Sequence, residues 1–183
     1  MCSKSHRHLG KYLVNRYMTT ASCYYQVAFL FGCFEPDWNP VTYIKGSLRF
    51  QWLRGHNYRN AYRYMRRIAH RLEKKKVLKL LDYYTLGKLI HYTADSFTYA
   101  HNDSFPPSLE AHREYEVNLQ EYFLRYVQSD PRIDTQTAAT IIDTIRYYHL
   151  KYEAREINVF KDATYAVTVC CCILTLLLTE PIP

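Results

Sequence analysis

The chain has 183 residues, enough to bury a core without disulfide bonds or a second lobe, so we expect one domain over residues 1–183. Hydrophobic residues make up 48% of the sequence and only 5 residues are glycine, which argues against a turn-rich β-sandwich and favours an all-α fold. The formal net charge of +7 is spread unevenly along the chain and indicates a local basic surface.

The N-terminal sequence, Met-Cys-Ser-Lys-Ser-His, lacks the apolar segment of a signal peptide. We therefore expect a cytoplasmic protein, or an extracellular one if the chain is a processed mature form. The six cysteines show no spacing typical of a disulfide framework, so free thiols are expected.

Apolar residues recur at helical spacing in several stretches, which predicts a compact bundle of helices. We place these helices near residues 6–18, 21–33, 57–75, 77–96, 108–127, 135–158 and 162–178. Between the second and third, the segment from Phe34 to Gly55 contains two prolines and two glycines and predicts a long ordered loop. Loops of this length in compact domains are often functional.

The predicted helix at 57–75 and the residues around it hold much of the positive charge. Between Arg54 and Lys79 this region contains Arg63, Arg66, Arg67, Arg71, Lys74, Lys75 and Lys76. One interpretation is contact with an anionic membrane surface or a nucleic acid. The other is an ordinary solvated helix face, and the sequence leaves both open.

The last predicted helix includes thirteen apolar or small residues, from Ala166 to Leu178. A helix needs about 20 such residues to span a bilayer. This segment is therefore expected to be a buried core helix, and no transmembrane segment is predicted.

The spacing of metal-ligand residue types is the strongest functional signal. His91 and Asp95 are four residues apart in one predicted helix, and His112 and Glu116 repeat this spacing in the next. His101 lies between the two pairs. Burying this many ionisable groups among apolar neighbours is costly without a counter-charge, which a metal cluster supplies.

Zinc suits imidazole and carboxylate ligands, and a carboxylate such as that of Asp95 can bridge two ions. Pairs of zinc ions about 3.5 to 4 Å apart are typical of sites that bind a phosphoryl group and polarise an attacking water. The pattern therefore indicates hydrolysis of a phosphoric ester with zinc as the cofactor.

The run YYTLGKLIHYTADSFTYAHN followed by HREYE resembles the core signature of the zinc-dependent phospholipase C family, which shares a helical three-zinc fold with fungal single-strand nucleases. The resemblance implies that His91 and Asp95 serve a paired metal site. It also implies that His101, His112 and Glu116 hold a separate zinc close by.

Further ligands are implied by the resemblance in the order in which the family supplies them. Asp37 matches the family's aspartate from an early loop, and His56 matches the histidine shortly after it. His6 matches the histidine at the start of the first helix, with His8 as the fallback. The resemblance thus implies two or three zinc ions, with Asp37 able to act also as a catalytic group.

One family feature is absent, because no N-terminal tryptophan supplies its amino and carbonyl groups. Only five residues precede His6, so a frayed terminus with one zinc weakly held or missing is one expectation. If Met1 were removed, the amine and thiolate of Cys2 would be alternative zinc ligands.

The predicted function is zinc-dependent, phospholipase C-type hydrolysis of phospholipid headgroups by a zinc-activated water. A single-strand nuclease or phosphatase on the same cluster is one alternative, with nucleic acid as the substrate of the former. A non-catalytic, zinc-stabilised binding protein is another, since structural zinc sites are closed and catalytic ones keep an open position.

Overall fold

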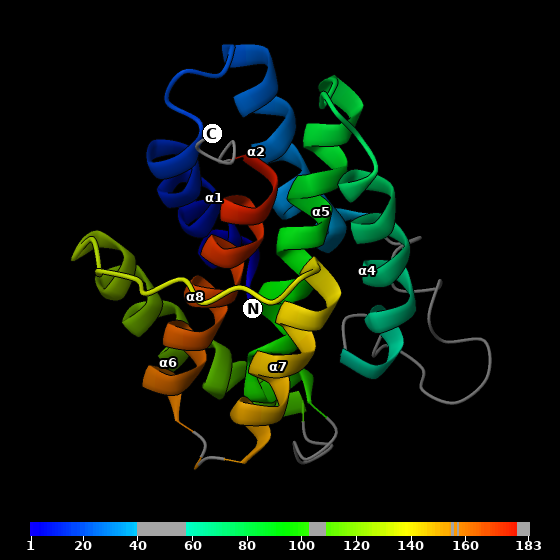
Figure 1. Ribbon diagram of the computed structural model, residues 1–183. Helices are drawn as coiled ribbons and strands as arrows, with labels where there is room; N and C mark the ends of the chain where they lie inside the picture. Colours follow the sequence, from blue (N-terminus) through cyan, green and yellow to red (C-terminus); the bar gives the residue numbers. More distant parts are fainter. Residues whose placement is uncertain (40–57, 103–108, 155, 157, 179–183) are drawn as a thin grey trace.

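The computed structural model describes residues 1–39, 58–102, 109–154, 156 and 158–178, and its described part is all-helical, without strands. Figure 1 shows helices running roughly alongside one another, with one helix crossing the lower left of the bundle. The α-helices are α1 (Ser3–Tyr17), α2 (Cys23–Trp38), α4 (Tyr58–Glu73), α5 (Leu80–Ser96), α6 (Leu109–Gln128), α7 (Ile141–Glu153) and α8 (Val159–Leu178), and a short 3-10 helix, η1, spans Tyr99–His101.

Helix α5 lies at the centre of the fold, packed against α2, α4 and α8. Every residue from Leu86 to Thr98 is buried, so this helix presents no solvent-facing side along its C-terminal half. A helix that is buried all round is a core helix. Polar residues within that stretch, His91 and Asp95 among them, are therefore held in the interior.

Helix α8 is the other core helix. It is the one described helix that is long and apolar enough to cross a membrane, but 67% of its apolar window is buried inside the molecule. Cys170, Cys171 and Cys172 pack here with no solvent exposure, as small apolar residues. All six cysteines are free thiols.

The basic helix is α4, whose two faces differ sharply. Ala61, Met65, Ile68 and Leu72 are buried on one face. The opposite face exposes Arg59, Arg63, Arg66, Arg67 and His70. Its 3.6-residue periodicity explains why the sequence forms an amphipathic helix here.

Predicted boundaries were wrong at α2 and α7. The segment from Phe34 to Trp38 belongs to helix α2, although a loop was expected from Phe34. Pro36 removes a single backbone donor in the last turn, and the N–H of Asn39 still reaches the Glu35 carbonyl at 3.1 Å. The helix expected from residue 135 begins instead at Ile141, where the Thr140 side chain accepts a hydrogen bond from the Asp143 N–H.

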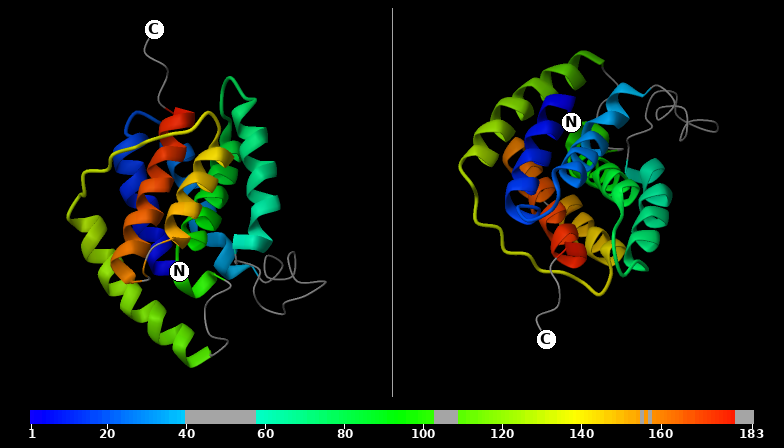
Figure 2. Two further views of the ribbon diagram at one scale, coloured as in Figure 1. Left: turned by 60° about the horizontal axis from the view of Figure 1, so that its bottom comes forward. Right: turned by 90° about the horizontal axis from the view of Figure 1, so that it is seen from above.

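The first residue lies inside the bundle, as the N labels in Figures 1 and 2 show. Met1 is 3% exposed. The expectation of a frayed terminus is therefore wrong in this structure. The right-hand view of Figure 2 shows α1 and α2 side by side near this residue.

Candidate metal centre

His91 and Asp95 form the centre of a buried polar cluster. Both side chains are fully buried, and they lie one turn apart on α5. His91 Nε2 is 3.2 Å from Asp95 Oδ2. The i, i+4 spacing predicted from the sequence therefore puts both groups on one helix face.

Two glycines allow α2 and α5 to approach closely beside this pair. A Cβ atom at Gly32 would lie 2.1 Å from the Tyr84 carbonyl oxygen, and one at Gly87 would lie 2.2 Å from the Phe29 carbonyl oxygen. No other residue type fits at these distances. The close crossing brings the backbone of α2 within hydrogen-bond distance of His91.

That contact orients the His91 ring. Nδ1 of His91 donates a hydrogen bond to the Cys33 carbonyl oxygen at 2.9 Å. A backbone partner of this kind fixes the tautomer and orientation of a metal-binding histidine. Nε2 is left facing two carboxylates, because Asp37 Oδ1 lies 3.6 Å away on the side opposite the backbone contact.

Helix α1 adds a second imidazole. His6 Nε2 is 3.1 Å from Asp95 Oδ1, and its ring stacks on that of His91 with centroids 3.9 Å apart. His6, His91 and Asp95 each offer one ligand atom, and these atoms all lie within 4.8 Å of one another. Ser3, on the same helix, donates a hydrogen bond to Asp37 Oδ2 at 2.7 Å.

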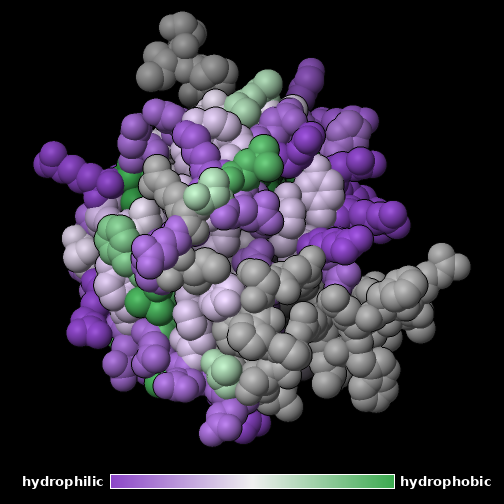
Figure 3. All heavy atoms as spheres, turned by 90° about the horizontal axis from the view of Figure 1, so that it is seen from below, coloured by the Kyte–Doolittle hydropathy of each residue, from purple (hydrophilic) through white to green (hydrophobic). Residues whose placement is uncertain are grey.

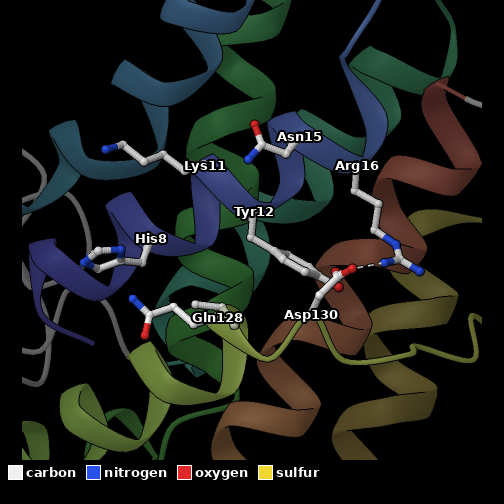
Figure 4. Close-up of a pocket in the computed structure, with 8 residues that line it drawn as sticks. His8, Lys11, Tyr12, Asn15, Arg16, Gln128 and Asp130 are labelled. Atoms are coloured by element: carbon white, nitrogen blue, oxygen red, sulfur yellow. Dashed lines mark hydrogen bonds and ion pairs between the residues drawn. The ribbon is translucent and has the colours of Figure 1, made fainter.

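His8, the fallback ligand, lies elsewhere. It lines a groove of about 410 Å³ between α1 and the C-terminal end of α6, together with Lys11, Tyr12 and Arg16. Figure 4 shows these side chains, with Arg16 paired to Asp130. This groove is separate from the cluster, so the structure brings His6 and not His8 to the candidate centre.

The amino group of Met1 enters the cluster from the N-terminal side. It donates hydrogen bonds to Asp95 Oδ1 at 2.6 Å and to His101 Nε2 at 2.7 Å. Glu116 Oε1 lies 3.4 Å from the same nitrogen. Cys2 does not take this place, because its thiol donates to the Gln120 side chain at 2.8 Å.

The third part of the cluster comes from η1 and α6. His101 Nε2 is 3.4 Å from Glu116 Oε1 and 3.8 Å from Asp95 Oδ1. A second buried carboxylate, that of Asp162 on α8, ties these two segments together. It accepts hydrogen bonds from the Tyr99 N–H at 2.8 Å and the Tyr115 hydroxyl at 2.7 Å.

Burial and charge shift the pKa values of the cluster in directions that suit metal binding. Burial alone would raise the pKa of Asp95, but the Met1 amino group and the three histidines hold it well below its ordinary value. Burial lowers the pKa of His6, and burial with the nearby amino group lowers that of His101 to about 4. Metal ligands must be deprotonated, and these groups are so at neutral pH.

Among the described groups of the cluster, carboxylates outnumber positive charges. Burial would lower the pKa of the Met1 amino group, but the carboxylates of Asp95, Glu116 and Asp37 outweigh this and raise it to about 10. Its single charge faces those three carboxylates, while His6 and His101 are neutral. A divalent cation supplies the missing charge, so these residues fit zinc.

Six of the eight predicted ligands are thus brought together by the structure, namely His6, Asp37, His91, Asp95, His101 and Glu116. His56 lies outside the described residues, and for His112 the structure describes only its place on α6, one turn before Glu116. The sequence did not predict the Met1 amino group or the Cys33 carbonyl. Every residue has a backbone carbonyl, so the sequence cannot show which carbonyl contacts a ligand. The one indication of a terminal amine was the comparison with the N-terminal tryptophan of the family, which this chain lacks.

Comparison with known proteins decides the family. A family profile described as zinc dependent phospholipase C matches residues 5–167. The chain belongs to the zinc-dependent phospholipase C family. The matched region includes every predicted ligand from His6 to Glu116. Neither the curated proteins nor the solved structures yielded a match to this chain.

Membership of the zinc-dependent phospholipase C family agrees with the all-helical fold and with the predicted zinc dependence. It also implies a phospholipid substrate. The family match carries no support for nucleic acid as a substrate.

Proposed function

We propose that this protein hydrolyses the headgroup phosphodiester of phospholipids, in a phospholipase C-type reaction, at the cluster around Asp95. The observation that carries the proposal is the convergence of six ligand-type side chains from α1, α2, α5, η1 and α6 in one cluster around the buried Asp95. Groups so distant in sequence meet in the interior only if something offsets their burial.

The cluster divides into three groups of ligands, two of which contain Asp95. Asp37, His91 and Asp95 form one group, to which the family pattern adds His56. His101 and Glu116 form a second, to which it adds His112. His6 and Asp95 form the third, and the Met1 amino group would join it only after losing its proton to an incoming metal ion. This division supports two or three zinc ions. When bound, zinc acts as a Lewis acid on phosphoryl oxygens and lowers the pKa of water to about 7.

Asp37 is the side chain that we propose as the general base. It lies at the last turn of α2 and is only partly buried, unlike Asp95. Ser3 holds Oδ2, while Oδ1 faces His91. A carboxylate held in this way can orient an attacking water and accept its proton. Asp95, with no exposure to solvent, is a ligand and not a base.

Metal removal tests the proposal. We expect that dialysis against a chelator abolishes hydrolysis of short-chain phosphatidylcholine, that zinc restores it, and that the zinc-loaded protein unfolds at a higher temperature. Native mass spectrometry gives the number of ions. Full activity of metal-free protein would contradict the mechanism. Faster cleavage of single-stranded DNA than of lipid, assayed side by side, would favour the nuclease alternative. Zinc binding without any hydrolysis would favour the non-catalytic one.

A further inference from the structure

The outer face of α2 carries a row of exposed apolar side chains, here called the apolar stripe. Tyr24, Val27, Phe31 and Trp38 are 75%, 64%, 49% and 64% exposed, and the half-buried Phe34 completes the row. Their spacing of three and four residues puts all five along one line of the helix. Single exposed apolar residues are ordinary, but a continuous row of this length marks an interaction surface.

A row of basic side chains runs beside the stripe on α1. Lys4, Arg7 and Lys11 are exposed at the same spacing of three and four residues. The Arg7 guanidinium lies over the rings of Phe34 and Trp38, 4.6 and 5.1 Å from their centroids, so the two rows are in direct contact. No aspartate or glutamate occurs between residues 3 and 34 of the sequence to neutralise this basic row.

The stripe and the basic row both lead to the candidate metal centre. Trp38 follows Asp37 directly, and Ser3, next to Lys4, donates the hydrogen bond that holds the Asp37 carboxylate. The face seen from below in Figure 3 is mainly hydrophilic in its described atoms, and its hydrophobic residues form small separate groups. The apolar stripe runs along α2, and its last member, Trp38, is next in sequence to Asp37 of the cluster.

We propose that the apolar stripe and the basic row together dock the protein onto an anionic phospholipid membrane. Aromatic side chains suit the boundary between headgroups and acyl chains, and adjacent lysine and arginine residues contact lipid phosphates. The inference rests on the proposed function, since docking here brings lipid headgroups to the edge of the zinc ligands. The inference identifies the surface that contacts the lipid substrate, which the pattern of zinc ligands alone does not reveal.

Two other arrangements fit the structure less well. A second copy packed on the same stripe would bring two basic rows together, and their repulsion opposes pairing. The basic face of α4 has more charge, but within Tyr58–Glu73 no large apolar side chain is exposed. Charge without apolar area gives only a salt-sensitive contact. The surface formed by α1 and α2 combines both.

Vesicle sedimentation of the zinc-loaded protein tests the proposal, with phosphatidylcholine vesicles that contain either no phosphatidylserine or about a third. The double variant Lys4→Gln/Lys11→Gln is expected to lose about fivefold in partitioning per charge removed, on anionic vesicles only. The pair Val27→Ser/Phe31→Ser should lose at least about tenfold on the same vesicles. The matched control, Arg66→Gln/Arg67→Gln on α4, removes the same charge and should change partitioning less than about twofold.

A second readout separates docking from catalysis. Hydrolysis of short-chain phosphatidylcholine below its micelle concentration should be the same in all variants, whereas hydrolysis of anionic vesicles should fall with partitioning. If no lipid is hydrolysed, the proposed function fails but the sedimentation result still decides the docking surface. The proposal would be overturned if the α4 control lost as much partitioning as the other variants, or if the stripe variants partitioned like wild type. It would also be overturned if the wild-type protein were a dimer that Phe31→Ser dissociates. Circular dichroism and zinc content confirm that each variant is folded.

Discussion

Two aspartates in the described part of the chain are completely buried, yet their surroundings are opposite. Asp162 accepts hydrogen bonds from two tyrosine hydroxyls, those of Tyr115 and Tyr152, and from the backbone N–H of Tyr99. Asp95 faces His6, His91 and His101, whose ring nitrogens can bind a metal, and one amino group. The first carboxylate is satisfied by the fold, whereas the second shares its space with other metal-ligand groups.

The difference appears in their pKa values. Burial raises the pKa of Asp162, and its neutral donors only partly oppose this. Burial acts in the same direction on Asp95, but the Met1 amino group and the histidines reverse it. The comparison shows that burial of a carboxylate does not identify a metal site. The chemical nature of the partners distinguishes the two carboxylates, and around Asp95 it suits a metal ion.

The largest effect is expected for Asp95→Asn. The amide keeps one acceptor but loses the negative charge that two of the ligand groups share. Lipid hydrolysis should fall at least about 100-fold, because loss of a group that only orients a metal ligand already costs ~10–100-fold. Zinc content should fall as well. Activity assays and native mass spectrometry measure both. The exposed Asp134→Asn is the matched control and should behave as wild type. Full zinc content in Asp95→Asn would remove Asp95 from the site.

Asp162→Asn should act mainly on stability. An amide group would point a donor at the hydroxyl or N–H groups that now donate to the carboxylate. We expect the free energy of unfolding to fall by about 2 to 4 kcal/mol, as for other buried polar groups left without partners. Denaturant unfolding measures this. Zinc content per folded molecule should stay near wild type. A stable variant that has lost zinc would mean that Asp162 belongs with Asp95.

The third prediction compares two histidines of one helix. His6→Gln should weaken binding of the most loosely held zinc by about 100-fold, since a direct ligand is lost. His8→Gln should leave zinc binding unchanged, because His8 lines the separate groove. Competition with a fluorescent zinc chelator measures the affinities. If His8→Gln weakened zinc binding as much as His6→Gln, the placement of α1 would be wrong.

The smallest effect is expected at His149, a buried histidine outside the cluster. Its ring stacks on that of Tyr58, with the two ring centroids 3.5 Å apart. Burial lowers its pKa to about 4 from the ordinary 6.5. As the pH falls, His149 is therefore protonated at a higher pH in the unfolded chain than in the folded protein. This proton uptake favours the unfolded state, so the free energy of unfolding falls below about pH 6.5. Between pH 7 and 5 wild type should lose roughly 1 to 2 kcal/mol more than His149→Phe. Urea unfolding at the two pH values measures this, and parallel curves would contradict it.

The sequence predicted the helices well because their apolar periodicity is strong and long. It predicted six members of the cluster because their residue types and spacing are written in the chain. Asp162 was not predicted, since its partners come from three distant segments and none has a characteristic spacing. The loop expected from Phe34 was wrong because Pro36 suggested a break that the last turn of α2 tolerates.

The glycine contact between α2 and α5 has a consequence for how this protein can vary. Gly32 and Gly87 carry no ligand, yet a single added methyl group at either would force the helices apart. The hydrogen bond between the Cys33 carbonyl and the imidazole of His91 would then break. Substitutions should consequently be tolerated less often at these two positions than across much of the surface, although neither residue is a ligand. Metal affinity should also fall as the distance between the two helix backbones increases.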